Sequence, residues 1–352
     1  MKIYRPFSFP RANGLSASSA LCATALRFVL GALALTATTW AQTATPPIPR
    51  EPFTFAALGC IPYARNADSR PSFLRLIAEI NRHHPAFTVH LGDTMGSDER
   101  CTDELLIQRR ADFNTFSSAL VYTPGDNEWT DTHNAKAGGY VPTERLAKIR
   151  ALYFADERSL GLKPLNVTTQ RRDPRFEKFV ENARWTEKGV VFATVHVVGS
   201  KNNHQPAVPG AMAEWREREA AVAAWIQTTF AEAQAARAPG VALFFQADPF
   251  ASDKGRAGYA EGFEGFLKTV EAEARAFKKP VLLVHADEHR YRHDTGMKFE
   301  LNAAVVPNVT RLETFGANQV HAVLVTVDPA SAQVFLPAPL LVPGNALPTL
   351  PR

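Results

Sequence analysis

The sequence has 352 residues, of which 45% are hydrophobic and 21% charged, so it is neither a disordered nor a highly charged chain. Its formal net charge is +4, but residues 1–41 hold four basic residues and no acidic one, which leaves 35 basic and 35 acidic residues in the rest. A neutral body without a run of lysines or arginines excludes a general polyanion-binding surface, and we therefore expect no nucleic-acid-binding surface.

The first 41 residues have the pattern of a secretory signal peptide. A basic segment precedes an apolar stretch at 28–36, and the small residues Thr39 and Ala41 place the cleavage site after Ala41. The apolar stretch is shorter than the ~20 residues that span a bilayer, so we expect a periplasmic or secreted protein with no membrane span after leader removal. An uncleaved anchor is the alternative. Residues 42–51 are predicted to be a tether.

Residues from 52 onward alternate between short apolar runs and helical patterns, which predicts an α/β protein with a mainly buried sheet. We expect one domain over 52–340, two long loops at 125–145 and 155–187, and a C-terminal tail at 341–352. The predicted strands are 53–59, 86–92, 119–124, 189–198, 241–248, 281–287, 310–315 and 320–327. The first predicted helix begins near Pro71. The others are predicted at 102–116, 142–154, 211–236 and 259–277.

Polar clusters follow several of these strands. They are Gly92-Asp93, Gly125 to Glu128, Asp248-Pro249 and Ala286 to His289. Ligands of open α/β sheets bind beyond the carboxyl ends of strands, so these carboxylates and the imidazole are candidates to converge on a divalent cation. The alternative for each cluster taken alone is a simple turn, because Gly-Asp and Asp-Pro are common in turns.

These clusters resemble the motifs of the calcineurin-like metallophosphoesterases. The strings at 125–129 and 198–203 are also similar to those of a group of secreted bacterial proteins. The resemblance implies a four-layer αββα sandwich of two mainly mixed β-sheets flanked by helices. It also implies a two-metal phosphoesterase site.

The resemblance assigns metal ligands residue by residue. Asp93 matches the aspartate that bridges both metals, and His289 matches a histidine ligand. Asp126 stands where the family has asparagine, and Asp287 where it has histidine, but either carboxylate can still bind a cation. The position of a lone family histidine falls on Ala247 or Asp248, and Asp248 could supply a further oxygen.

The opening motif of the family, Asp-x-His, corresponds here to Cys60-Ile61-Pro62, so neither usual ligand is present. Cys60 could bind a softer metal such as Zn²⁺ as a thiolate. Equally, Cys60 could form a disulfide with Cys101, since an oxidising compartment permits one. A free buried thiol is the third possibility.

Candidate catalytic and substrate-binding residues surround these ligands. Asn127 replaces the histidine that the family uses as an acid, and we expect it to hold substrate phosphate. His133 and His204 are candidate proton donors, with exposed loop histidines as the alternative reading. Asn202 and Asn203 are candidate substrate ligands or turn residues.

The predicted function is metal-dependent hydrolysis of a phosphomonoester or phosphodiester, on a small phosphorylated substrate, by an exported enzyme. The oxygen-rich ligand set suits Mg²⁺, Mn²⁺ or Ca²⁺, whereas a Cys60 thiolate would favour Zn²⁺. The alternative is a non-catalytic ligand-binding protein that retains the fold with a degenerate metal site, which the replaced opening motif and Asn127 both favour.

Overall fold

The structure is a computed structural model, and it describes residues 51–63, 69–250, 260–299 and 304–346. The predicted signal peptide and almost all of the predicted tether lie outside the described residues, as do the last six residues of the predicted tail. None of the helices in the described ranges has both the length and the apolar character that crossing a membrane requires.

The strands of the described residues form two mixed sheets, ordered β13-β12-β1-β2-β3-β4 and β10-β11-β9-β8-β7-β6-β5. The central strands β1, β2 and β3 run parallel in the first sheet, as do β7, β8, β9 and β11 in the second. The first sheet comprises β1 (Phe53–Leu58), β2 (Phe87–His90), β3 (Ala119–Tyr122), β4 (Leu160–Gly161), β12 (Ala322–Val327) and β13 (Phe335–Leu340). The second comprises β5 (Thr168–Thr169), β6 (Ala183–Glu187), β7 (Val190–Thr194), β8 (Val241–Phe244), β9 (Val281–His285), β10 (Arg292–Met297) and β11 (Val306–Glu313).

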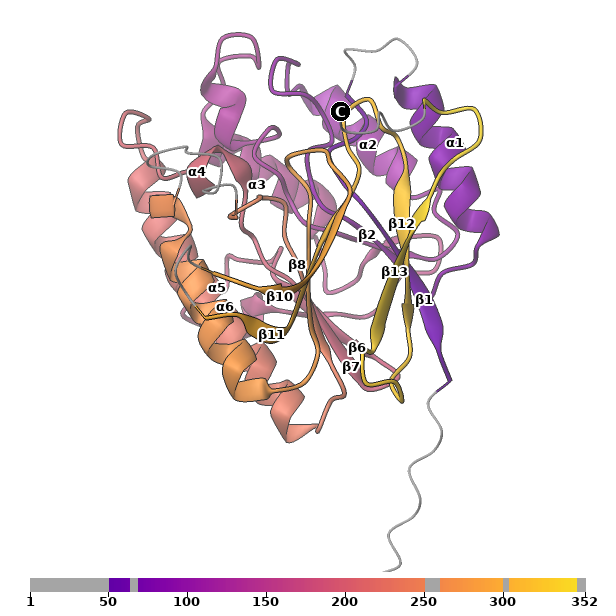
Figure 1. Cartoon of the computed structure of the whole chain (residues 1–352). Helices are drawn as coiled ribbons and strands as arrows, with labels where there is room; N and C mark the ends of the chain where they lie inside the picture. Colours follow the sequence, from indigo (N-terminus) through magenta and orange to yellow (C-terminus); the bar gives the residue numbers. More distant parts are fainter. Residues whose placement is uncertain (1–50, 64–68, 251–259, 300–303, 347–352) are drawn as a thin grey trace, which may run out of the picture. The chain divides into compact units, whose positions relative to one another are not determined.

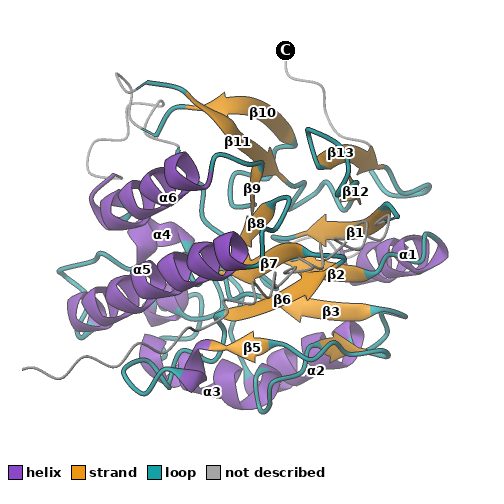
Figure 2. Ribbon diagram, turned by 90° about the horizontal axis from the view of Figure 1, so that it is seen from below, coloured by secondary structure: helices purple, strands orange, loops and turns teal. Residues whose placement is uncertain are grey.

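Helices cover the outer face of each sheet (Figures 1 and 2). The first sheet packs against α1 (Ser69–Arg82), α2 (Asp103–Phe113) and α3 (Pro142–Tyr153). The second packs against α5 (Ala211–Ala235) and α6 (Glu264–Phe277). The remaining short elements are η1 (Thr130–His133), η2 (Gln170–Arg172), α4 (Gly199–Asn202) and η4 (Ala260–Gly262).

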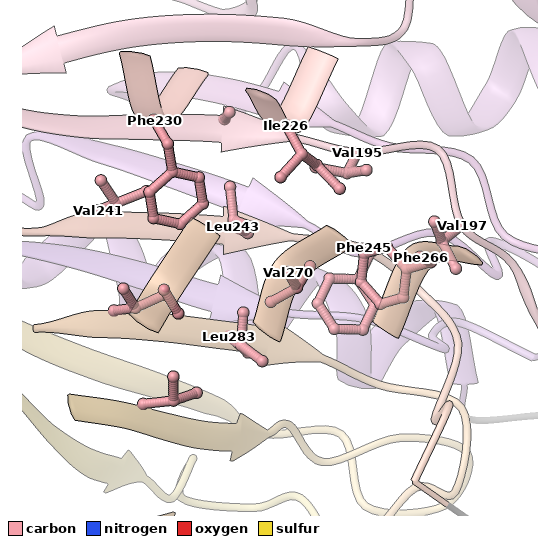
Figure 3. Close-up of a cluster of buried hydrophobic side chains, with 14 of the residues drawn as sticks. Val195, Val197, Ile226, Phe230, Val241, Leu243, Phe245, Phe266, Val270 and Leu283 are labelled. Atoms are coloured by element: carbon pink, nitrogen blue, oxygen red, sulfur yellow. The ribbon is translucent and has the colours of Figure 1, made fainter. Parts of the chain in front are cut away.

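Alternating side chains of each central strand enter two different apolar layers. Between the sheets, Phe55 of the first lies against Phe244 of the second, with ring centroids 5.6 Å apart. Neighbouring residues such as Leu243 point the other way, toward Phe230 and Val270 of the helices (Figure 3). The chain therefore builds three apolar layers between four layers of secondary structure, which confirms the predicted αββα sandwich.

The predicted loop at 155–187 is wrong, because this segment adds β4 to the first sheet and β5 and β6 to the second. In β6 burial alternates, and Trp185 enters the core between the sheets while Thr186 is exposed. Such a half-exposed strand near the edge of the sheet lacks the continuous apolar run by which the central strands were predicted. All the predicted strands are present, with shifted ends. The predicted helix 259–277 is helical from Glu264, and Tyr259 lies outside the described residues.

Candidate metal centre

The carboxyl ends of parallel strands from both sheets carry the candidate site. Asp93 follows β2 and Asp126 follows β3 in the first sheet, whereas Asp287 follows β9 in the second. One side-chain oxygen of each aspartate lies within 4.8 Å of the others. Three of the four strand-end aspartates that the sequence singled out therefore meet at one point.

The three carboxylates repel one another in a poorly solvated place. Burial raises the pKa of Asp93 well above its usual value, and the charges of Asp126 and Asp287 raise it further. Burial likewise raises the pKa of Asp126, whose Oδ1 is buried and has no hydrogen-bond partner. A divalent cation relieves both problems, since it offsets the repulsion and gives the orphaned oxygen a partner. The three aspartates could thus hold a metal ion, and an all-oxygen set suits Mg²⁺, Mn²⁺ or Ca²⁺.

The loops that carry the site are strained and tightly packed. Cys60, Asp93, Asp287 and His289 all have left-handed backbones, with φ between 54° and 80°. A left-handed backbone costs a non-glycine residue about 1–3 kcal/mol, and such residues concentrate at functional sites. Packing leaves no room to relax, because a Cβ atom on Gly125 would lie only 2.1 Å from Asp93 Oδ1.

Asp93 is held by donors from three loops. Its Oδ2 accepts hydrogen bonds from Tyr63 Oη (3.1 Å), Asn127 Nδ2 (3.0 Å) and Gln246 Nε2 (3.2 Å). The backbone N–H of Asn127 donates to Asp93 Oδ1 over 3.1 Å. The predicted substrate ligand Asn127 therefore lies in the site, with its amide directed at Asp93.

Glu128 connects the loop after β2 with the loop after β3. Its Oε1 accepts hydrogen bonds from the backbone N–H groups of Asp93 (3.1 Å) and Gly125 (2.9 Å) and from Tyr122 Oη (2.6 Å). Glu128 is completely buried, and burial raises its pKa. We conclude that it fixes the separation of the Asp93 and Asp126 loops.

The two cysteines of the predicted mature chain are free buried thiols, so no disulfide joins them. Cys101 donates from Sγ to the backbone oxygen of Glu128 over 3.2 Å. Cys60 lies in the site, with Sγ 3.6 Å from Asp93 Oδ2, and Sγ accepts the backbone N–H of Asp287 at 3.2 Å. Burial first, then the charges of Asp93 and Asp287, raise the pKa of the Cys60 thiol.

His289 lies beside the aspartates and contacts them through a tyrosine. Its Nε2 is 3.1 Å from the hydroxyl of Tyr63, which in turn donates to Asp93. The two rings meet edge to face with centroids 5.5 Å apart. His289 and Cys60 thus adjoin the aspartate cluster on the side of Tyr63.

The carboxylate of Asp248 lies in an adjoining arginine cluster. It is completely buried, 3.6 Å from Arg292 and 3.8 Å from Arg311. Its backbone N–H, by contrast, donates to Asp287 Oδ2 over 3.2 Å. Asp248 therefore supports the site through its main chain, while its side chain contacts cations of β10 and β11.

The other candidates contact residues other than the three aspartates. Asn202 and Asn203 are buried, and their amide groups donate to Gly262 O (3.0 Å) and Glu214 Oε2 (2.8 Å). The ring of His204 packs on Trp215, with centroids 4.5 Å apart. His133 bonds the backbone of its own turn, with Nδ1 2.8 Å from Thr130 O.

Residues 200–203 form one turn of left-handed backbone, with φ between 47° and 60°. Each such residue costs about 1–2 kcal/mol, and Arg218 anchors the turn by donating to Asn202 O over 2.9 Å. The turn presents Ser200, whose Oγ lies 2.8 Å from Asp126 Oδ2 and 2.7 Å from Asp131 Oδ1. Ser200 therefore orients one oxygen of Asp126 and leaves the other to the cluster.

Sequence reasoning missed Tyr63, Gln246 and Ser200 as site residues. Gln246 is completely buried and follows β8, which ends at Phe244 and not at 248 as predicted. Had the predicted strand ended at Phe244, Gln246 would have been assigned to the loop that carries the site. Tyr63 follows the motif position at 60–62, and Ser200 lies inside the string at 198–203, but neither was singled out as a site residue.

No protein-family model matches this chain, and no curated protein sequence matches it. Solved structures do resemble it. PhoD has 12% identity over 80% of this chain and 64% of its own, with a TM-score of 0.48. Purple acid phosphatase PPD1 from yellow lupin (Lupinus luteus) seeds has 12% identity over 83% and 54%, with a TM-score of 0.48. Phosphopantetheinyl hydrolase (PptH) from Mycobacterium tuberculosis has 15% identity over 76% and 90%, with a TM-score of 0.41. The chain spans less than two thirds of the length of the first two.

Proposed function

We propose that this protein is a metal-dependent phosphoester hydrolase whose centre is formed by Asp93, Asp126 and Asp287. One observation carries the proposal: three carboxylates, two buried and one half-buried, converge within 4.8 Å from strand ends of two different sheets. Such a cluster is costly unless a cation completes it. The motif resemblance at Gly92-Asp93, 125–128 and 286–289 supports phosphoester hydrolysis as the reaction.

The chain's own residues would position the cation and the substrate. Asp93, Asp126 and Asp287 are the ligands, and Ser200 and Gln246 fix the orientation of their carboxylates. When bound, a divalent cation polarises a phosphoryl oxygen and lowers the pKa of a water molecule. The hydroxyl of Tyr63 and the imidazole of His289 lie on one side of the cluster, where they would border a bound phosphoryl group.

The substrate we propose is a small phosphorylated molecule, met outside the cytoplasm if the leader directs export. A monoester and a diester both fit this chemistry, because the cation recognises the phosphoryl oxygens that both share. Catalytic roles for Asn127 and His133, ligand roles for Asp248, Cys60 and His289, and substrate contacts of Asn202, Asn203 and His204 belong to the same proposal as individual hypotheses.

A non-catalytic ligand-binding protein is the second candidate, and the surroundings of Asp93 favour it. Asp93 Oδ2 accepts hydrogen bonds from four side chains, Cys60, Tyr63, Asn127 and Gln246, so part of its capacity to bind a cation is already used. In that case the site binds a cation or an anion-containing ligand without turning it over.

The deciding experiment measures bound metal and turnover in the same preparations. The purified protein is loaded with Mn²⁺, Mg²⁺ or Zn²⁺ and assayed on a panel of phosphomonoesters and phosphodiesters. Asp93→Asn and Asp287→Asn should lower kcat/KM by at least about a hundredfold. Asp173→Asn is the matched control, since this aspartate pairs with Arg175 on the surface.

These measurements distinguish the hydrolase from the non-catalytic binding protein. Metal binding without turnover of any substrate in the panel would favour the binding protein. Turnover that persists unchanged in Asp93→Asn would remove this centre as the site of catalysis.

A further inference from the structure

We infer that the centre holds one divalent cation, and that Tyr63 fills the place of the second cation implied by the resemblance to the metallophosphoesterases. The inference rests on the proposed function and deepens it.

Two-metal catalysis needs two ions about 3.5–4 Å apart that share a ligand. The shared ligand in the resemblance is Asp93, and a second ion on its Cys60 side would be bound by Asp93 and His289. Ligand atoms hold such ions at about 2.0–2.2 Å, so an ion bound to both side chains lies in the gap between them.

The hydroxyl of Tyr63 already occupies this gap. Its oxygen is 3.1 Å from Asp93 Oδ2 and 3.1 Å from His289 Nε2. Tyr63 is 7% exposed, and its hydroxyl also lies 3.4 Å from Asn127 Nδ2, so packing and a third contact keep it in place. An ion ligated by Asp93 and His289 together would have to displace this hydroxyl.

Two amides add N–H groups to the same oxygen, and their orientation is fixed by partners elsewhere. Asn127 Nδ2 also donates to the backbone oxygen of Met95 over 3.0 Å, which identifies this atom as nitrogen. Gln246 Oε1 accepts the backbone N–H of Gly199, so its Nε2 faces the aspartates. Amide N–H groups donate hydrogen bonds and do not bind cations. Asp93 Oδ2 is therefore surrounded by donors.

The cluster also has an oxygen that no hydrogen bond occupies. Asp126 Oδ1 is buried without a hydrogen-bond partner, and Asp126 is within 4.8 Å of Asp93 and Asp287. The structure therefore offers one cation position, on the three aspartates, and closes the position next to Tyr63.

The test counts bound manganese. The protein is saturated with excess Mn²⁺, desalted, and measured by elemental analysis and electron paramagnetic resonance. We expect one Mn²⁺ per chain and the six-line spectrum of an isolated ion. In Tyr63→Ala a second ion should bind, so that the ratio doubles and the spectrum gains the extra lines of a coupled pair.

Tyr140→Ala is the matched control and should keep one ion, and Tyr63→Ser serves if Tyr63→Ala does not fold. Two coupled ions in the unaltered protein would overturn the inference and leave the proposed function standing. No ion at all would overturn both. A ratio of one in every folded Tyr63 variant would remove Tyr63 as the group that closes the second position.

Discussion

Gln246 of the second sheet donates a hydrogen bond to Asp93 of the first, with Nε2 3.2 Å from Oδ2. The same nitrogen is 3.2 Å from Asp287 Oδ1, and the amide oxygen accepts the N–H of Gly199. One neutral side chain thus connects the loops after β2, β7, β8 and β9. It supplies donors where two negative groups would otherwise repel each other.

Replacing the amide of Gln246 by a carboxylate should turn its attraction for Asp93 and Asp287 into repulsion. In Gln246→Glu a fourth carboxylate enters the cluster, and we expect the metal-free protein to lose about 3–5 kcal/mol of unfolding free energy. Added Mn²⁺ should raise the stability of the variant more than that of the unaltered protein. Urea unfolding with EDTA and with Mn²⁺ measures both effects. Gln246→Met, which removes the donor without adding charge, should lose only about 1–3 kcal/mol. Equal losses in the two variants would contradict the electrostatic explanation.

Metal removal should lower stability by an amount that depends on the free cation. At a Mn²⁺ concentration a hundred times its dissociation constant, binding adds about 2.7 kcal/mol to the unfolding free energy. Thermal unfolding of the EDTA-treated protein should therefore shift upward when Mn²⁺ is added. Asp126→Asn and Asp287→Asn should abolish most of this shift, whereas Asp173→Asn should retain it. A full shift in the first two variants would place the cation elsewhere.

Ser200 should tune the affinity for the cation without being a ligand. Its hydroxyl lies 2.8 Å from Asp126 Oδ2, so Ser200→Ala frees the carboxylate to rotate. Residues that orient a metal ligand typically change affinity by about 10–100-fold, and we expect a loss of this size in a Mn²⁺ titration by calorimetry. The surface variant Ser331→Ala is the control. An unchanged dissociation constant in Ser200→Ala would show that the turn at 200–203 has another purpose.

Acid should destabilise the fold through His90, which lies in the core beneath the site. Burial lowers the pKa of His90 to about 3, from about 6.5 in the unfolded chain. Between these values the unfolded state binds a proton that the folded state does not, so unfolding free energy falls as the pH falls from 6.5 toward 3. The slope from this one group is about 1.4 kcal/mol per pH unit near pH 4–5.5.

The contribution of His90 is measured as the change in unfolding free energy between pH 7 and pH 4.5, determined by urea unfolding. His90→Gln keeps a donor for Ile61 O, which His90 Nε2 contacts at 2.9 Å, but does not titrate. The variant should therefore lose less stability on acidification than the unaltered protein. Identical pH dependence in the two proteins would mean that His90 does not titrate as described.

The central fold was predictable because buried parallel strands are apolar on both faces. Strands such as β8 and β9 are completely buried along their length, and their sequences show it directly. The edge strands do not show this continuous apolar pattern. In β13, for example, Pro337 and Pro339 interrupt an apolar pattern on an outer strand, where proline is tolerated. Pairing with β12, which the local sequence does not encode, makes this segment a strand.

The candidate site was predictable where a charged residue follows a strand at once. Asp93, Asp126 and Asp287 met this condition, and their convergence follows from the parallel strand order. Asp248 met the same condition, but its side chain lies against Arg292 and Arg311, which belong to strands that the local sequence around Asp248 does not specify. Tyr63 and Ser200 depend on loop conformations with left-handed residues, which sequence alone does not specify.

The three aspartates are divided between the sheets, two on the first and one on the second. A cation that binds all three is therefore a crosslink, closing a ring of chain from 93 to 287. Unlike a disulfide, it stabilises the folded chain alone, because unfolding separates the three carboxylates and releases the cation. Its affinity then reports how closely the two sheets are packed. A small side chain in place of Phe244, the last residue of β8 and buried between the sheets, should weaken the binding of the cation by loosening that ring.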